Sequence, residues 1–186
     1  MSKVCIFLAD GFEEIEGLTV VDMLRRADIE ISMISVTGSL NIRGSHDICL
    51  SADVLFEDAD FSDTEMFILP GGMPGTLNLK AHEARCALLI SACQNDKYLA
   101  AICAAPIVLG SLGILQGKKA TCYPAADLEA QLTGAEHLSV PVVTDGKIIT
   151  SRGMGTAIEF AAVLIEKLKG QETADALLQS IVYRVG

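Results

Sequence analysis

Short apolar segments alternate with helix-like segments along the chain, and this alternation constrains the fold more than any other feature. Strand-like runs lie at 3–9, 29–36, 65–72, 98–102 and 118–123. Helix-like runs lie at 19–27, 82–96, 104–112, 156–170 and 172–180. A hairpin is expected at 140–151, and a short strand or hairpin is expected around 48–56, in the less clear segment 41–59. Apolar strands separated by helices predict a mostly parallel sheet with helices on both faces, which is an α/β fold.

The helix expected at 156–170 has the clearest end signals. Thr156 and Glu159 form a capping-box pattern at its start, and Gly170 follows its last lysines.

The composition is that of a globular chain. Hydrophobic residues make up 51% of the 186 residues, and this length lies in the usual range of one domain. We expect residues 1–186 to form a single domain. No apolar run is long enough to span a membrane, and the first residues lack the cleavage site of a signal peptide. A cytoplasmic protein is therefore expected.

The formal net charge of −10 argues against nucleic acid and anionic membrane surfaces as partners, because both require clustered Lys and Arg. The six cysteines contain no CxxC pair and show no metal-site spacing with the three histidines. We expect no bound metal and no disulfide framework, so local context has to single out any functional cysteine.

Ligands of open α/β sheets bind beyond the carboxyl ends of the parallel strands. Three segments leave those ends here, namely ADGFEEIE, PGGMPG and ICAAP. Residues far apart in the sequence can therefore meet at one edge of the sheet.

Cys103 lies where a strand turns into a helix, between small neighbours such as Ala101, Ala104 and Ala105. A nucleophile elbow needs small residues around its strained corner, and a helix N-terminus favours a thiolate. The amide of Ala104 would then face an oxyanion on an attacked carbonyl. The motif alone is equally compatible with a buried, inert cysteine in an alanine-rich layer.

Three carboxylates follow the first strand, at Glu13, Glu14 and Glu16. Glu13 and Glu14 are explained by the preference of helix N-termini for negative charge. The position of Glu16 suits a side chain turned toward the elbow. We predict a buried, neutral Glu16 with a raised pKa beside an anionic Cys103, a pair that can move protons without histidine.

These segments together resemble the ThiJ/PfpI superfamily, also written DJ-1/PfpI, and within it the small single-domain DJ-1-like branch. The matching segments, in order, are ADGFEEIE, VVDMLRRA, LPGGMPGTLNL, LAAICAAP and TSRGMGTAIEFAA. The resemblance implies a flavodoxin-like three-layer sandwich, a nucleophile elbow like that of class I amidotransferases, and a homodimer.

The resemblance also implies roles for individual residues. The nucleophile falls on Cys103 and its acidic partner on Glu16. The backbone donors fall on Gly72 and Ala104, with Gly71 alongside.

Other positions carry the family's supporting residues or depart from them. The dimer-side arginine falls on Arg26. The GSRD-like stretch of the family reads GSHD at 44–47, so His46 replaces the expected arginine. Tyr123 occupies the place of a histidine near the cysteine. Tyrosine cannot act as a base at neutral pH, but it can donate a hydrogen bond to substrate. A Cys-His-acid triad, and with it a peptidase or amidase, is therefore not supported.

Two functions remain open. The resemblance implies a cofactor-free enzyme that converts methylglyoxal to lactate, of the glyoxalase III type, and protein deglycase activity on glycated substrates. The alternative is an oxidative-stress sensor or chaperone in which Cys103 is oxidised to sulfinic acid. An enzyme turns over repeatedly without oxidant, whereas a sensor changes state once.

Overall fold

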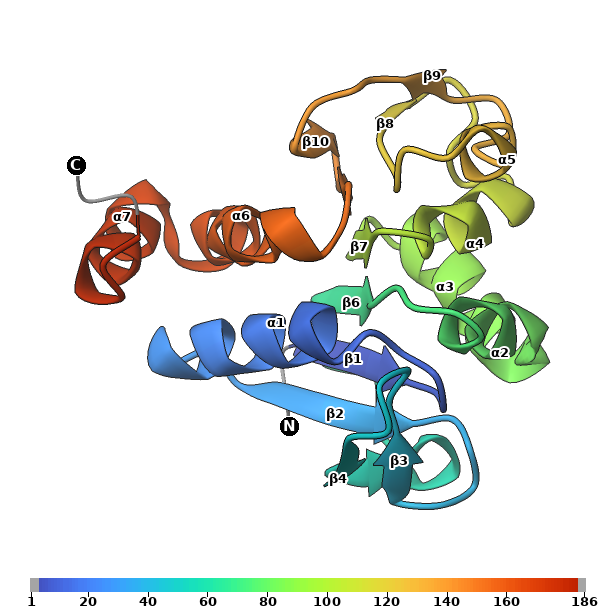
Figure 1. Cartoon of the computed structure of the whole chain (residues 1–186), viewed down its shortest axis with the longest axis horizontal. Helices are drawn as coiled ribbons and strands as arrows, with labels where there is room; N and C mark the ends of the chain where they lie inside the picture. The colour runs from blue at the N-terminus through green and yellow to red at the C-terminus, as the bar shows by residue number, and fades with distance from the viewer. Residues whose placement is uncertain (1–3, 184–186) are drawn as a thin grey trace.

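The computed structural model describes residues 4–183 and has a seven-stranded sheet of order β10-β11-β7-β6-β1-β2-β5 at its centre (Figure 1). Its strands are β1 (Val4–Leu8), β2 (Ile31–Ser35), β5 (Val54–Leu55), β6 (Met66–Leu69), β7 (Tyr98–Ile102), β10 (Val142–Asp145) and β11 (Ile148–Ser151). All neighbouring pairs are parallel except β10 with β11. The order β2-β1-β6-β7-β11 is the doubly wound order of flavodoxin-like folds, so the predicted α/β class is confirmed.

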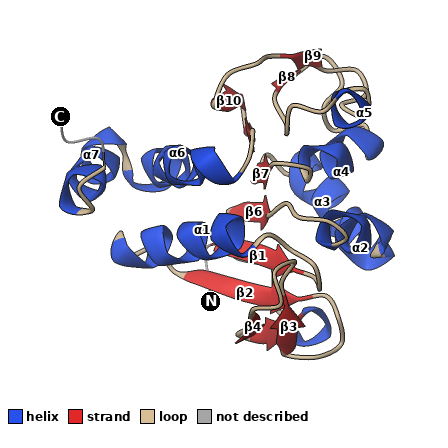
Figure 2. Ribbon diagram, in the orientation of Figure 1, coloured by secondary structure: helices blue, strands red, loops and turns tan. Residues whose placement is uncertain are grey.

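Helices cover both faces of this sheet (Figure 2). They are α1 (Glu14–Arg26), α2 (Gly75–Ala81), α3 (Glu83–Gln94), α4 (Pro106–Ser111), α5 (Ala126–Glu129), α6 (Ala157–Lys169) and α7 (Gln171–Ser180). Side chains alternate across β1, so Ile6 belongs to the buried core that includes residues of α1, α6 and α7, whereas Phe7 belongs to the core that includes residues of α2, α3 and α4. Within residues 4–183, no helix is long and apolar enough to cross a membrane.

Two small sheets and two 3-10 turns complete the fold. The pairs are β3 (Asn41–Arg43) with β4 (Cys49–Ser51), and β8 (Lys119–Ala120) with β9 (Glu136–His137); the turns are η1 (Phe56–Asp58) and η2 (Met154–Thr156). The segment 48–56, for which a short strand or hairpin is expected, contains β4 and β5, but the hairpin partner of β4 is β3, which precedes that segment. The hairpin expected at 140–151 is confirmed. The strand expected at 118–123 is reduced to Lys119–Ala120, which are the residues that pair with β9.

Two details of the predicted helices are wrong. The helix expected at 19–27 already begins at Glu14, because Gly17 does not interrupt it but allows close packing against Phe12. The capping box at Thr156 is absent. The Thr156 hydroxyl instead donates to the Gly153 carbonyl at 2.9 Å, and Glu159 accepts a hydrogen bond from the Tyr183 hydroxyl.

Candidate active site

The segments that follow β1, β6 and β7 meet at the carboxyl edge of the sheet. The Gly71 amide, after β6, donates to Oε2 of Glu16 at 2.9 Å. A Cβ atom on Gly71 would lie 2.5 Å from this oxygen and 2.6 Å from Cβ of Cys103, which follows β7. Glu16, Gly71 and Cys103 are therefore in direct contact, and no side chain fits at position 71.

Cys103 occupies a strained backbone corner. Its φ is +63°, in the left-handed region that β-carbon-bearing residues rarely adopt. The Cys103 amide donates to the Ser151 carbonyl at 2.9 Å, and the Cys103 carbonyl accepts from the Tyr123 amide at 2.8 Å. Ala104 and Ala105 beside it are buried. These hydrogen bonds hold Cys103 in a backbone conformation that is about 1–3 kcal/mol less favourable than an ordinary one. Residues held in such conformations cluster at active sites.

Glu16 is a carboxyl group that is removed from water. It is 1% exposed, and burial raises its pKa to about 7 despite hydrogen bonds from Cys103 and the Gly71 amide. Among residues 4–183, its Oε1 atom has no partner at ordinary hydrogen-bond distance. At neutral pH the carboxyl is therefore poised between its protonated and ionised forms.

The expected anionic state of Cys103 is not borne out. Burial, followed by the charge of Glu16, raises the pKa of Cys103 to about 12. The amides of Ala104 and Gly72 act in the opposite direction but do not compensate for burial. The helix dipole is also weak here, because α4 has only six residues and begins at Pro106. The resting pair is a thiol beside a partly ionised glutamate.

The predicted backbone donors do surround the sulfur. The amides of Gly72 and Ala104 both lie close enough to lower the pKa of Cys103. Gly72 has φ +91°, and a Cβ atom there would lie 2.3 Å from the Glu13 nitrogen. Only glycine can therefore present its amide at this position.

The opposite wall contains one predicted residue and one that the sequence reasoning missed. A Cβ atom on Gly153 would lie 3.9 Å from both Sγ of Cys103 and Oε1 of Glu16, and 3.5 Å from the Tyr123 ring. Tyr123 is 49% exposed, so its ring reaches solvent. We use the word cleft for the partly exposed site that Cys103, Gly153 and Tyr123 form above buried Glu16. Gly153 lies in the TSRGMGT segment, and its role depends on this contact rather than on a local pattern.

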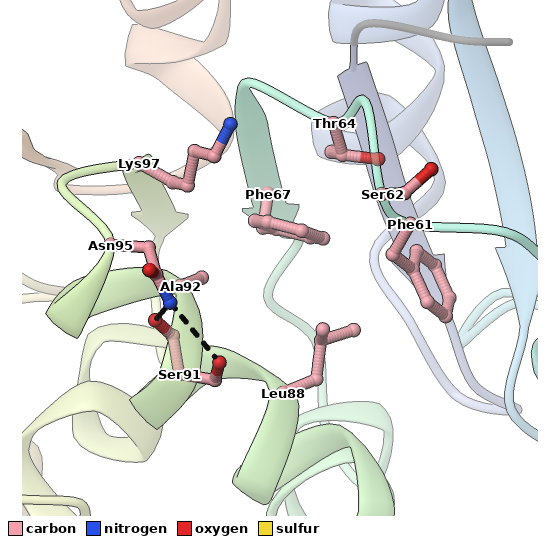
Figure 3. A pocket seen from close by; sticks show the side chains of 9 residues that line it. All are labelled: Phe61, Ser62, Thr64, Phe67, Leu88, Ser91, Ala92, Asn95 and Lys97. Carbon is pink, nitrogen blue, oxygen red and sulfur yellow. Dashed lines mark hydrogen bonds between the residues drawn. The ribbon is translucent and has the colours of Figure 1, made fainter.

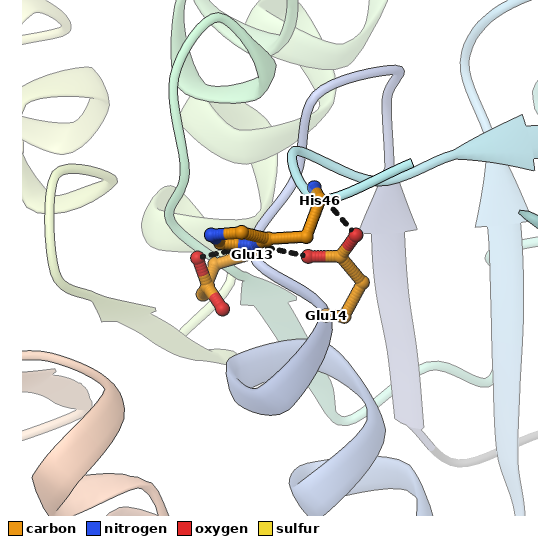
Figure 4. A group of neighbouring side chains, drawn as sticks. All are labelled: Glu13, Glu14 and His46. Atoms are coloured by element: carbon orange, nitrogen blue, oxygen red, sulfur yellow. Dashed lines mark hydrogen bonds and ion pairs between the residues drawn. The ribbon is translucent and has the colours of Figure 1, made fainter. Parts of the chain in front are cut away.

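His46 is joined to the start of α1 (Figure 4). Its Nδ1 lies 3.0 Å from Oε2 of Glu14 and 3.6 Å from Oε2 of Glu13, and its amide donates to Oε1 of Glu14 at 2.8 Å. Burial alone would raise the pKa of Glu14, but hydrogen bonds from His46 and Ser45 together lower it to about 2. Glu14 was expected only to complement the helix N-terminus. In the structure it is buried and also binds the 44–47 loop through hydrogen bonds with Ser45 and His46.

The same three side chains are the candidate metal ligands of the site. One ligand atom from each of Glu13, Glu14 and His46 lies within 4.8 Å of the others. The sequence spacing did not suggest this group, because the β3–β4 loop brings His46 to α1 from a distant position.

Arg26 lies away from the cleft. It is at the last turn of α1, about 15 Å along the helix axis from Glu16, and its Nε pairs with Asp22 at 2.6 Å. Arg26 is therefore too far from Glu16 and Cys103 of the same chain to contact them.

A cavity of about 330 Å³ opens at the other edge of the sheet, between α3 and the segment before β6 (Figure 3). Phe67 and Leu88 contribute apolar surface and Lys97 contributes its ammonium group, while the Asn95 side chain is tied to Ser91. Neither Cys103 nor Glu16 lines this cavity, so it is separate from the cleft.

Comparison with known proteins identifies relatives along nearly the whole chain. The profile of the DJ-1/PfpI family matches residues 2–167. The chain is 33% identical to the dj-1beta protein of Drosophila melanogaster, over 98% of each chain. It is 28% identical to a deglycase of Thermococcus kodakarensis, over 90% of this chain and 99% of the relative.

Two plant relatives are longer. The chain is 36% and 37% identical to DJ-1 homologues B and A of Arabidopsis thaliana, but spans only 39% and 46% of their lengths. Solved structures agree with the fold. Oxidized DJ-1 of Toxoplasma gondii has a TM-score of 0.93 at 36% identity, covering 99% of this chain and 100% of its own. Drosophila DJ-1beta has a TM-score of 0.92 at 34% identity, covering 98% of each chain.

Proposed function

The chain belongs to the DJ-1/PfpI family, and on this basis we propose that it is a cofactor-independent cysteine enzyme that acts on reactive dicarbonyls. The observation that carries the proposal is the buried contact between Cys103 and Glu16. The pKa of the Glu16 carboxyl in this contact is raised to about 7. A carboxyl group with this pKa can both accept and return a proton at neutral pH.

The first step is attack of Cys103 on the aldehyde of methylglyoxal. Because the thiol is protonated at rest, ionised Glu16 takes the Sγ proton as the C–S bond forms. The amides of Gly72 and Ala104 stabilise the resulting oxyanion. Glu16 then protonates that oxygen, which leaves a hemithioacetal and restores the carboxylate.

The second step moves hydrogen between the two substrate carbons. Glu16 removes the proton from the sulfur-bearing carbon, and the ketone oxygen takes a proton from water to give an enediol. Glu16 then returns its proton to the neighbouring carbon, and the hydroxyl on the sulfur-bearing carbon loses its proton to water. The product is an S-lactoyl thioester, and water hydrolyses it to lactate and free Cys103. The Tyr123 hydroxyl is proposed to donate a hydrogen bond to a substrate oxygen, and no glutathione or metal is required.

Glycated protein is the second proposed substrate class. It is supported by the deglycase from Thermococcus kodakarensis that matches this chain over 90% of its length. A peptidase or amidase is not proposed. Of the three histidines, His46 contacts Glu14, His82 caps α3 and His137 pairs with Glu129, so none serves Cys103.

A redox function remains as the alternative, because one related structure is an oxidized DJ-1. In that role Cys103 is oxidised by peroxide to a sulfinate, and protonated Glu16 donates a hydrogen bond to it.

Lactate formation from methylglyoxal by the purified chain, without glutathione or metal, distinguishes the two functions. We expect many product molecules per chain in the absence of oxidant, and unchanged turnover after Cys93→Ser on the exposed face of α3. Absence of turnover, together with stoichiometric conversion of Cys103 to sulfinate by mild peroxide, would establish the sensor function instead. Lactate is measured by NMR and sulfinate by peptide mass spectrometry.

We also propose a homodimer formed through α1. Leu18, next to the cleft end of α1, is 38% exposed, Ile15 is 50% exposed, and Met154 in η2 is 52% exposed. Such a group of apolar side chains is typical of a protein interface. Arg26 at the other end of α1 is the expected dimer-side arginine. Analytical ultracentrifugation is expected to show a dimer that dissociates in Leu18→Glu, and a monomeric wild type would refute this proposal.

A further inference from the structure

Gly153 lies in the wall of the cleft, beside the point where the two reacting side chains meet. It directly precedes η2, in the segment that joins β11 to α6. A Cβ atom at this position would lie 3.9 Å from Sγ of Cys103 and 3.9 Å from Oε1 of Glu16. Because glycine has no side chain, space for a small group remains beside both atoms.

The other side of the pair is closed by backbone. A Cβ atom on Gly71 would lie 2.5 Å from Oε2 of Glu16 and 2.9 Å from the Ile102 carbonyl oxygen, so no group fits there. The Gly71 amide also donates to Oε2. Oε1 is buried and, among residues 4–183, has no hydrogen-bond partner. The free oxygen of Glu16 is therefore the one beside the space at Gly153.

The proposed reaction needs this space, and the following step rests on the function proposed above. The first substrate carbon is bonded to Sγ of Cys103, and each carbon that exchanges a proton with Oε1 has to approach it to about 3–3.5 Å. Carbon atoms that are not bonded pack at about 3.5–4.0 Å from one another. A methyl group 3.9 Å from both Sγ and Oε1 would therefore compete with the second substrate carbon and its substituent.

We propose that Gly153 is a specificity-determining residue, which makes the site selective for 2-oxoaldehydes with a small group such as methyl on the second carbon. This group occupies the space that a side chain at position 153 would fill. Tyr123 bounds the space on its outer side, because its ring lies 3.5 Å from the Cβ position of Gly153. Gly153 thus sets the selectivity between substrates and takes no part in the proton transfer.

The substitution Gly153→Ala fills this space while leaving the empty protein nearly unchanged. The nearest atoms would lie 3.5–3.9 Å from the new Cβ atom, which is ordinary contact distance. The φ of Gly153 is 161°, which is extended backbone that alanine also adopts. Gly155→Ala in η2 is the matched control, because nothing lies within 4 Å of a Cβ atom at that position.

Steady-state turnover of glyoxal and methylglyoxal by the wild type and both variants tests this role. The two substrates differ in the group on the second carbon, hydrogen or methyl, and their products, glycolate and lactate, are distinguished by NMR. Gly153→Ala should lower kcat/KM for methylglyoxal relative to glyoxal by about tenfold or more, because one methyl group changes selectivity by about 10–200-fold. Gly155→Ala should leave this ratio within about twofold of the wild type.

The possible outcomes separate the role of Gly153 from the function on which it rests. A wild type that converts neither substrate overturns both. An active wild type with an unchanged ratio in Gly153→Ala, or with equal losses for the two substrates, overturns only the role of Gly153. Wild-type turnover of phenylglyoxal, which carries a phenyl group on the second carbon, should be at least about tenfold slower than that of methylglyoxal. Equal rates would overturn the role of Gly153 even if Gly153→Ala failed to fold.

Discussion

Replacement of Cys103 by serine is expected to lower kcat/KM for methylglyoxal by about 10³-fold or more. A serine hydroxyl at neutral pH is a far weaker nucleophile than a thiol, and Glu16 is too weak a base to activate it. The left-handed backbone and the bonds to Ser151 and Tyr123 do not depend on sulfur. The fold should therefore be retained, and steady-state lactate formation measures the loss.

The matched control is Cys93→Ser, which replaces an exposed thiol outside the cleft. It is expected to leave kcat/KM within about twofold of the wild type, because surface substitutions have small effects. Activity retained in Cys103→Ser would show that the thiol is not the nucleophile, and the covalent mechanism would then be wrong. Unfolding curves in urea verify that both variants are folded.

The arrangement of the cleft was predictable because it follows from topology. Parallel strands deliver the loops after β1, β6 and β7 to one edge, so topology predicts that these loops meet and that Glu16 lies near Cys103, whereas the place of Gly71 was implied by the family resemblance. The raised pKa of Glu16 followed from its position between the elbow and the core. Sequence order and apolar patterning suffice for such features.

The charge state of Cys103 was not predictable in the same way. Burial raises the pKa of Cys103, and the amides of Ala104 and Gly72 lower it. The degree of burial is set by the packing of segments that are distant in the sequence. The same limit applies to the contact of His46 with Glu14, which lie 32 positions apart in the sequence. No local pattern encodes a contact between such distant polar side chains.

Replacement of Glu16 by glutamine is expected to lower kcat about 10²–10⁴-fold, because the amide can neither accept nor return a proton. The wild-type kcat/KM should rise with pH around an apparent pKa of about 7, since only ionised Glu16 can take the proton of the Cys103 thiol. Glu83→Gln, which replaces an exposed carboxylate at the start of α3, should change kcat less than about threefold. An activity that instead falls as the pH rises through 7 would show that protonated Glu16 beside a thiolate is the active form.

Glu16→Gln should also change how stability depends on pH. The raised pKa of Glu16 means that the folded state holds its proton more tightly than the unfolded state does. This contribution is fully present below pH 4.5 and is lost as the pH rises through about 7. Between pH 5 and pH 8, the free energy of unfolding of the wild type should fall by roughly 2–3 kcal/mol relative to Glu16→Gln. Urea unfolding at both pH values measures the difference. Equal pH dependence of the two proteins would mean that Glu16 ionises as freely in the folded chain as in water, and such a carboxylate could not return a proton at neutral pH.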